Sequence, residues 1–186
     1  MNPILLDFPS EFTTERLLIR APQSGDGKAV HDAILSSMDQ LRPWMPFAQT
    51  EPFLEETEAN IREAAAHFLL RKDLRLLVFH KETKEFLASS GLHRINWEAR
   101  CFEIGYWISS KYEGMGYMTE AVEGIIHFAK TELDARRIEI RVNSDNVKSR
   151  RIPEKLGFQL EGILRRNDLS LTDQSPRDTC IFSLIF

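Results

Sequence analysis

The apolar residues change their spacing at a pair of glycines, and this change constrains the fold more than any other feature. Upstream, residues 101–108 alternate with the two-residue period of a strand. Downstream, one helical face carries Val122, Ile125, Ile126, Ala129 and Leu133. Gly114 and Gly116 lie in the loop between the two patterns. The segment therefore predicts a strand, a glycine loop and a helix over about 119–133.

Weaker patterns complete an α/β chain. Strands are expected at 16–21, 74–79, 86–95, 101–108, 137–142, 159–165 and 179–186. Helices are expected from Asp26, as a possible cap, to residue 35, over 55–70, and in a short segment that ends at Leu156, with Gly157 as a left-handed cap. Hairpin-length turns between 74 and 108 indicate an antiparallel meander. We expect one α/β (α+β) domain over 1–186, with a mixed, mostly antiparallel sheet of about seven strands flanked by helices on both faces.

Composition narrows the function classes. The 186 residues carry a net charge of −4, which argues against a protein that coats nucleic acid. Two cysteines and five scattered histidines give no metal-ligand spacing, so no metal is expected. No apolar run approaches the ~20 residues of a membrane span, and the N-terminus lacks a basic start. We therefore expect a cytoplasmic protein with no membrane partner.

The glycine loop is the strongest chemical signal. Glycines let a backbone approach a ligand, and successive N–H groups at a helix N-terminus suit a phosphate. The alternative is a tight turn that merely needs glycine conformations. A Walker A loop would require Gly-Lys-Ser/Thr, and a Rossmann loop would require a third glycine.

Four further segments carry a family resemblance. The loop reads Lys111-Tyr112-Glu113-Gly114-Met115-Gly116, close to Gln/Arg-x-x-Gly-x-Gly/Ala but with lysine first, and Glu-Ile-Gly-Tyr-Trp-Ile precedes it. The other matching segments are 14–20 (Thr-Glu-Arg-Leu-Leu-Ile-Arg), 146–150 (Asn-Val-Lys-Ser-Arg) and 152–158 (Ile-Pro-Glu-Lys-Leu-Gly-Phe). From about residue 13 the chain resembles the GNAT superfamily of N-acetyltransferases, and within it the ribosomal-protein alanine and serine N-acetyltransferases.

The resemblance implies acetyl-CoA as co-substrate and no metal. Its pyrophosphate would lie on the backbone of the loop, and the pantetheine arm would lie along the preceding strand. The residues implied are Trp107, Ile108, Glu113, Gly114, Met115, Gly116, Tyr117, Met118, Asn146 and Ser149. Lys148, Arg150 or Arg151 could reach the 3′-phosphate, although a solvated basic face is the alternative.

Glu103 is the candidate catalytic base. Strand alternation places it on one face with Gly105 and Trp107, near the expected thioester. A solvent-facing acid is the alternative for Glu103. His93, on the adjacent strand, is the rival base; a structural or substrate-contacting histidine is the other interpretation.

The candidate acid is Ser149. Many superfamily members have a tyrosine acid where this chain has Pro153, which has no proton to donate. The subgroup resembles this chain in having a serine at Ser149, but Ser149 could instead cap the helix. Asn146 could bond the pantetheine or cap the same helix.

The acceptor side is expected in residues 1–75, the acyl-CoA core in 76–160 and the closing strands in 159–186. Trp44 and Phe47 could form a wall of the acceptor site, or pack in the core. The expected acceptor is a protein N-terminal α-amine. The alternatives are a small amine (antibiotic, polyamine or amino acid) and a non-catalytic acyl-CoA-binding module. A homodimer is left open.

Overall fold

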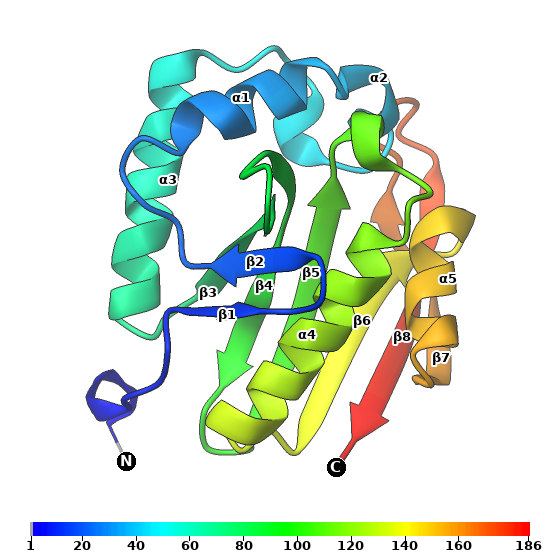
Figure 1. Cartoon of the computed structure of the whole chain (residues 1–186). Coiled ribbons are helices and arrows are strands. Elements are labelled where there is room, and N and C mark those ends of the chain that lie inside the picture. The colour runs from blue at the N-terminus through cyan, green and yellow to red at the C-terminus, as the bar shows by residue number, and fades with distance from the viewer. Residues whose placement is uncertain (1) are drawn as a thin grey trace.

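The computed structural model describes residues 2–186, which form one eight-stranded sheet with helices on both faces (Figure 1). The strands are β1 (Glu11–Thr13), β2 (Leu17–Arg20), β3 (Leu74–His80), β4 (Phe86–Asn96), β5 (Cys101–Ile108), β6 (Arg137–Asn143), β7 (Gln159–Leu169) and β8 (Pro176–Ile185). The helices are α1 (Gly27–Leu35), α2 (Met38–Leu41), α3 (Leu54–Leu69), α4 (Tyr117–Glu132) and α5 (Val147–Lys155), with 3-10 turns at Pro3–Leu5, Pro46–Ala48 and Ser110–Tyr112.

The sheet order is β1-β2-β3-β4-β5-β6-β8-β7, and every neighbouring pair is antiparallel except β5 with β6. The expected meander over β3, β4 and β5 and the mostly antiparallel sheet are therefore confirmed. The expected strand count was one too low. The missed strand, β1, has three residues and pairs with β2, which is too short a run to show a two-residue period.

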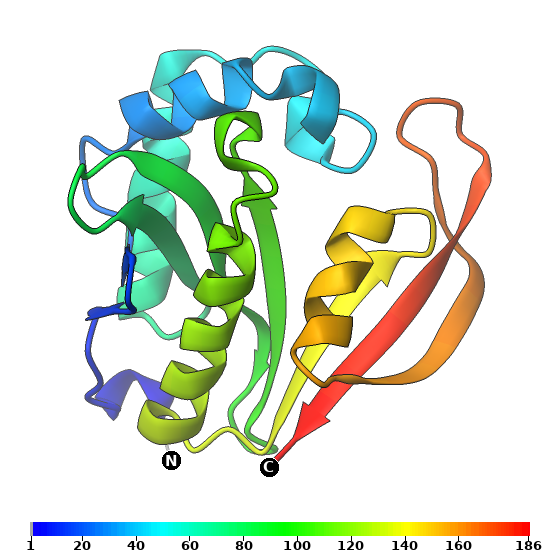
Figure 2. The same ribbon diagram turned by 45° about the vertical axis from the view of Figure 1, so that its right-hand side comes forward.

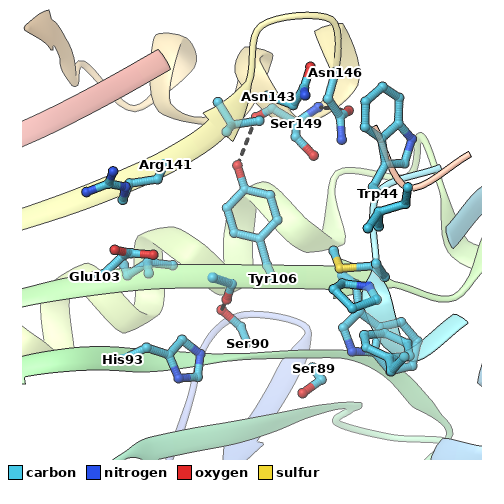
Figure 3. Close-up of a pocket in the computed structure, with 18 of the residues that line it drawn as sticks. Trp44, Ser89, Ser90, His93, Glu103, Tyr106, Arg141, Asn143, Asn146 and Ser149 are labelled. Atoms are coloured by element: carbon cyan, nitrogen blue, oxygen red, sulfur yellow. Dashed lines mark hydrogen bonds between the residues drawn. The ribbon is translucent and has the colours of Figure 1, made fainter. Parts of the chain in front are cut away.

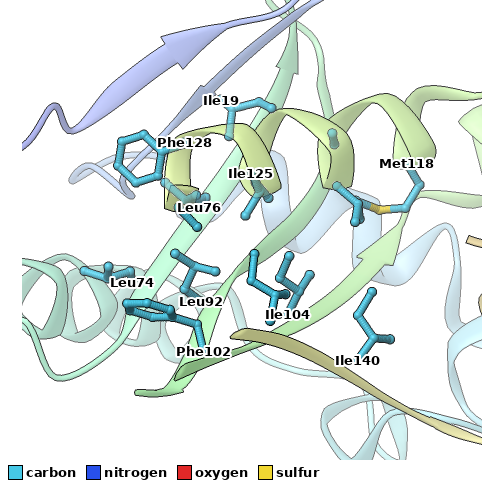
Figure 4. Packing of buried hydrophobic residues seen from close by; sticks show 14 of the residues in the cluster. Ile19, Leu74, Leu76, Leu92, Phe102, Ile104, Met118, Ile125, Phe128 and Ile140 are labelled. Carbon is cyan, nitrogen blue, oxygen red and sulfur yellow. The ribbon is translucent and has the colours of Figure 1, made fainter. Parts of the chain in front are cut away.

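Two hydrophobic clusters cover the two faces of the sheet. Helix α4 packs on one face, where Ile125 and Phe128 meet Phe102 and Ile104 of β5 (Figure 4). On the other face, Trp107 of β5 packs with residues of α1, α2 and α3. The alternation expected along β5 is thus confirmed, and it directs Glu103, Gly105 and Trp107 toward the α1–α3 side.

Strands β5 and β6 separate along their length. They pair in parallel only from Cys101 opposite Arg137 to Glu103 opposite Glu139. Beyond Glu103 the two strands splay apart, and α5 lies beside β6 while β5 continues toward the glycine loop (Figure 2). The remaining edge of β5 is therefore free to pair with something other than β6.

The start of α1 differs from expectation. Asp26 stands at the N-cap position but its side chain makes no capping hydrogen bond. Its carboxylate instead accepts two hydrogen bonds of 2.7 Å from the guanidinium of Arg20. A bidentate ion pair with β2 satisfies the carboxylate better than the local helix N–H groups would.

Candidate active site

Two cavities lie on either side of the β5–β6 splay. The first, of about 1070 Å³, is bounded by the loop before α3, by the floor of β3 to β6 and by the β7–β8 hairpin. The second, of about 780 Å³, lies between the glycine loop, α5 and the segment from α2 to Met45. The part they share is lined by Trp44, Met45, Tyr106, Trp107, Asn146 and Ser149. Molecules in the two cavities would therefore meet beside β5.

The second cavity contains nearly all the residues expected to hold CoA. The expected residues that line it are Trp107, Ile108, Glu113, Gly114, Gly116, Tyr117, Met118, Asn146 and Ser149. Met115 does not line it: the residue is 54% exposed, and its carbonyl accepts a hydrogen bond from Arg16. Lys148 and Arg151 also line this cavity, whereas Arg150 does not.

Left-handed glycines shape the loop. Gly114 has φ +76° and Gly116 has φ +81°. A Cβ at Gly114 would meet nothing within 4 Å, so glycine is required there for conformation and not for space. Gly116 is the N-cap of α4 and has no side chain to accept from the first-turn N–H groups. These uncapped donors lie at the wall of the second cavity, an arrangement that fits a pyrophosphate.

Arg16, the residue before β2, holds the loop in place, a contact that sequence reasoning did not identify. Its Nε donates to Glu120 Oε2 at 2.6 Å, and its Nη1 donates to the carbonyl of Met115 at 3.1 Å. Its guanidinium also lies 4.4 Å from the centre of the Tyr117 ring. The sequence indicated a strand and a family pattern in this segment, and the structure supplies the physical reason for Arg16.

Glu103 and His93 lie opposite each other on β5 and β4 and line the first cavity (Figure 3). Burial raises the pKa of the Glu103 carboxyl, although Arg94, at 3.6 Å, and Arg141 oppose the rise. The Nδ1 of His93 lies 2.7 Å from Asp73 Oδ2. Since a carboxylate only accepts, this contact places a proton on Nδ1.

Helix α5 is capped by Asn146, whose Oδ1 accepts from the backbone N–H of Ser149 at 3.1 Å. The suggestion that Ser149 caps the helix is therefore wrong, because Ser149 is three residues inside. The Ser149 hydroxyl makes no hydrogen bond within residues 2–186 and belongs to the lining that both cavities share. The suggested capping role of Asn146 is confirmed.

The backbone carbonyl of Ser149 accepts a hydrogen bond from Tyr106 in place of a donor that Pro153 cannot supply. Pro153 lies inside α5 and has no N–H, so the carbonyl of Ser149, four residues earlier, lacks its helical donor. The Tyr106 hydroxyl donates to this carbonyl at 2.8 Å and so joins β5 to α5 across the splay (Figure 3). In the sequence, Pro153 stood out because it occupies the position where many superfamily members have a tyrosine acid. No local pattern could indicate that Tyr106 bonds the carbonyl that Pro153 leaves without a donor.

Trp44 and Phe47 line the first cavity. Phe47 is 42% exposed and its ring centre lies 5.7 Å from that of Trp107, whereas Trp44 is partly buried beneath the guanidinium of Arg177. The alternative of simple core packing is thus wrong for Phe47. Arg177 also donates to the carbonyl of Pro43 at 2.8 Å, which ties β8 to the loop that carries Trp44.

Two further observations bound the site. No helix within residues 2–186 is long and apolar enough to cross a membrane. Among the same residues, no three His, Cys, Asp or Glu side chains gather as metal ligands would.

Comparison with known proteins identifies the family. Residues 16–159 match the model of the acetyltransferase (GNAT) domain, so this chain belongs to the GNAT family of acetyltransferases. The chain is similar to an uncharacterized N-acetyltransferase of Bacillus subtilis (strain 168), YoaA, with 27% identity covering 92% of this chain and 94% of the relative. It is also similar to the ribosomal-protein-serine acetyltransferase of Escherichia coli (strain K12), with 26% identity covering 82% and 84%. The chain is an N-acetyltransferase.

Solved structures agree in fold. The acetyltransferase MccE, solved with acetyl-CoA and AMP, superposes with a TM-score of 0.87 at 19% identity, covering 96% of this chain and 98% of that one. The ribosomal alpha-N-protein acetyltransferase RimL, solved with coenzyme A, has a TM-score of 0.86 at 20% identity, covering 93% and 96%. The single GNAT fold expected from the sequence is confirmed.

Proposed function

We propose that this enzyme transfers the acetyl group of acetyl-CoA to the N-terminal α-amine of a protein, as relatives named ribosomal-protein acetyltransferases do, by direct attack in a ternary complex. The observation that carries the proposal is the pair of cavities that meet beside β5. Two substrates bound from opposite sides would have their reacting atoms adjacent, and such positioning supplies much of the barrier reduction in transfer reactions. No covalent enzyme intermediate is then needed.

The volume of the first cavity supports a peptide end over a small amine. At about 1070 Å³ it stands at the upper end of ligand pockets, which span ~300–1,000 Å³. Trp44, Phe47 and Trp107 give it apolar walls, and Glu103 and His93 supply polar groups on the floor. We assign residues 1–75 mainly to this acceptor side, residues 76–160 to the acyl-CoA core and the last two strands to its closure.

In the proposed reaction, acetyl-CoA supplies a thioester whose carbonyl carbon accepts the amine. The glycine loop binds the pyrophosphate, and the free edge of β5 near Trp107 and Ile108 pairs with the pantetheine arm. Glu103 takes a proton from the incoming ammonium through water, which leaves a neutral amine to attack. The C–N bond forms and the C–S bond breaks. The departing thiolate takes a proton from the Ser149 hydroxyl, which regains one from the nitrogen as the amide forms.

The test measures thiol release from acetyl-CoA, and the mass of the product, with N-terminal peptides that begin with alanine or serine and with small amines as acceptors. Acetylated peptide α-amines are the expected result. Turnover restricted to an antibiotic, polyamine or amino acid would replace the acceptor we propose. CoA binding without turnover of any amine would indicate an acyl-CoA-binding module and refute the proposed enzyme activity.

The CoA site is tested separately by calorimetry. Gly114→Trp should abolish CoA binding, because the indole fills the cavity and L residues resist φ +76°. Met115→Trp is the matched control, since Met115 lies in the same loop but outside the cavity. Unchanged affinity in Gly114→Trp would refute the loop as the pyrophosphate site.

A further inference from the structure

The first cavity is lined by four arginines and no lysine, and Arg75 is the one that β3 contributes, in register with Gly91 of β4 and Gly105 of β5. Arg94 pairs with Glu103 at 3.6 Å, and Arg141 lies near enough to lower the pKa of the same carboxyl. Arg177 is held by the carbonyl of Pro43 and the hydroxyl of Ser170. Arg94 is therefore paired with a carboxylate and Arg177 is held by two neutral groups, whereas the Arg141 side chain forms no hydrogen bond or ion pair within residues 2–186.

Arg75 has only neutral partners. Its Nε donates to Ser89 Oγ at 3.1 Å and its Nη1 donates to Asn60 Oδ1 at 2.6 Å. Within residues 2–186 it forms no ion pair shorter than 4.0 Å. A guanidinium carries five N–H donors, so three remain without a protein acceptor. Its Nη2 has no partner within residues 2–186 and is not fully buried, and Arg75 is one of the residues that line the cavity.

The carboxylates near Arg75 are directed elsewhere. Asp73, which immediately precedes β3, accepts from His93 at 2.7 Å. Glu56 lines the same cavity from α3 and accepts from the backbone N–H of Phe53. Burial of Arg75 penalises its charge and lowers its pKa, with Asp73 opposing the shift only as a secondary cause. A partly buried cation with free donors is a good receptor for an anion that the protein itself does not supply.

We infer that Arg75 is a specificity-determining residue that binds a carboxylate of the acceptor, and that the acceptor is therefore a peptide with an acidic side chain near its N-terminus. This inference rests on the proposed function, because it names the class of peptide that the first cavity takes. Held by Asn60 and Ser89, the guanidinium is oriented before the ligand arrives, which favours a planar carboxylate.

The sheet register sets the spacing between amine and anion. Arg75 lies opposite Gly91 on β4, and Gly91 lies opposite Gly105 on β5. Two strand spacings separate Arg75 from β5, about 10 Å. An extended peptide rises ~3.3 Å per residue, which places the acidic side chain at about the second to fourth residue. The α-carboxylate of a free amino acid would be too close to its amine to reach Arg75.

The experiment compares three pairs of peptides that begin with alanine and have Glu or Gln at position two, three or four. Binding to the protein saturated with CoA is measured by calorimetry, so that no turnover intervenes. We expect one Glu peptide to bind about 10- to 100-fold more tightly than its Gln partner, the range of a hydrogen bond between charged groups. Arg75→Gln should remove this preference, so that the Glu and Gln peptides bind with equal affinity.

Two variants serve as controls. Lys72→Gln removes an equal charge three residues away on an exposed side chain and should keep the preference. Arg75→Lys should keep a part of it, because the charge remains but the planar pair of donors is lost. The inference is overturned by equal binding of both peptides at all three positions in the wild type, by absence of binding, or by a preference that persists in Arg75→Gln.

Turnover measured in parallel separates the two proposals. Charge-dependent binding without acetylation of any peptide refutes the proposed function and upholds the role of Arg75 as a receptor. Acetylation of Glu and Gln peptides that bind with equal affinity refutes the role of Arg75 and leaves the proposed function standing.

Discussion

The hydrogen bond from Tyr106 to the Ser149 carbonyl should couple stability to catalysis, and Tyr106→Phe tests this. The substitution leaves the carbonyl without the donor that replaced the missing N–H of Pro153. An unsatisfied buried carbonyl costs about 1–3 kcal/mol, and water from the adjoining cavities should reduce this to about 1 kcal/mol. For a chain of this size that corresponds to a fall in Tm of roughly 2–4 °C.

A double-mutant cycle tests whether Tyr106 replaces the hydrogen-bond donor that Pro153 lacks. Pro153→Ala restores a backbone N–H four residues after Ser149, so the carbonyl regains its helical donor. Tyr106→Phe should then cost less in the Pro153→Ala background than in the wild type, with a coupling of about 0.5–1 kcal/mol in denaturant unfolding. Strictly additive free energies of unfolding would refute the idea that the tyrosine replaces the proline's absent donor.

Kinetics supply the second measurement. If the bond positions the turn of α5 that carries the Ser149 hydroxyl, Tyr106→Phe should lower kcat about tenfold and leave CoA affinity unchanged. Ser149→Ala should lower kcat as well, and adding Tyr106→Phe to it should cause little further loss. Equal losses of kcat from Tyr106→Phe with and without Ser149 would show that the tyrosine does not act through the serine.

Two further predictions follow from the sheet. Glu103 must be ionised to act as a base, so kcat/KM should fall as the pH decreases through its raised pKa. Glu103→Gln should lower turnover and flatten this acid limb of the pH profile without changing CoA affinity. An unchanged acid limb in the variant would leave His93 as the base. Gly91→Ala should cost about 1–3 kcal/mol of unfolding free energy, because its Cβ would lie 2.5 Å from the carbonyl oxygen of Leu74 at φ +150°. Gly162→Ala, with nothing within 4 Å, should be nearly neutral in the same denaturant titration.

The parts of the fold that were predicted correctly have strong local periodicity. Helix α4 and the meander of β3, β4 and β5 have apolar residues at regular spacing, and their bounds were found to within about two residues. The length of the first strand of the last hairpin was underestimated: a strand was expected over 159–165, whereas β7 runs to Leu169. Its side chains are almost all exposed. An exposed strand leaves no hydrophobic face to detect, so its length is set by pairing with β8.

In the candidate site, too, some features could be predicted from the sequence and others could not. Gly114 and Gly116 could be identified from sequence, because a left-handed backbone needs glycine whatever surrounds it. The family resemblance named Glu103 and Ser149, but it could not distinguish a helix cap at Ser149 from a free hydroxyl. That distinction required the helix start, which Asn146 defines.

The sequence by itself therefore determined most of the strands and helices, the glycine loop and the family, since each depends on residues close together in the chain. It missed β1 and α2, which are short. The tertiary structure alone decided which side chains meet at the site. Tyr106 reaches Ser149 across 43 positions, Arg16 reaches Glu120 across 104, and Arg177 reaches Pro43 across 134. Such contacts depend on how the whole sheet pairs and splays, and polar partners so far apart leave no period in the chain by which to find them.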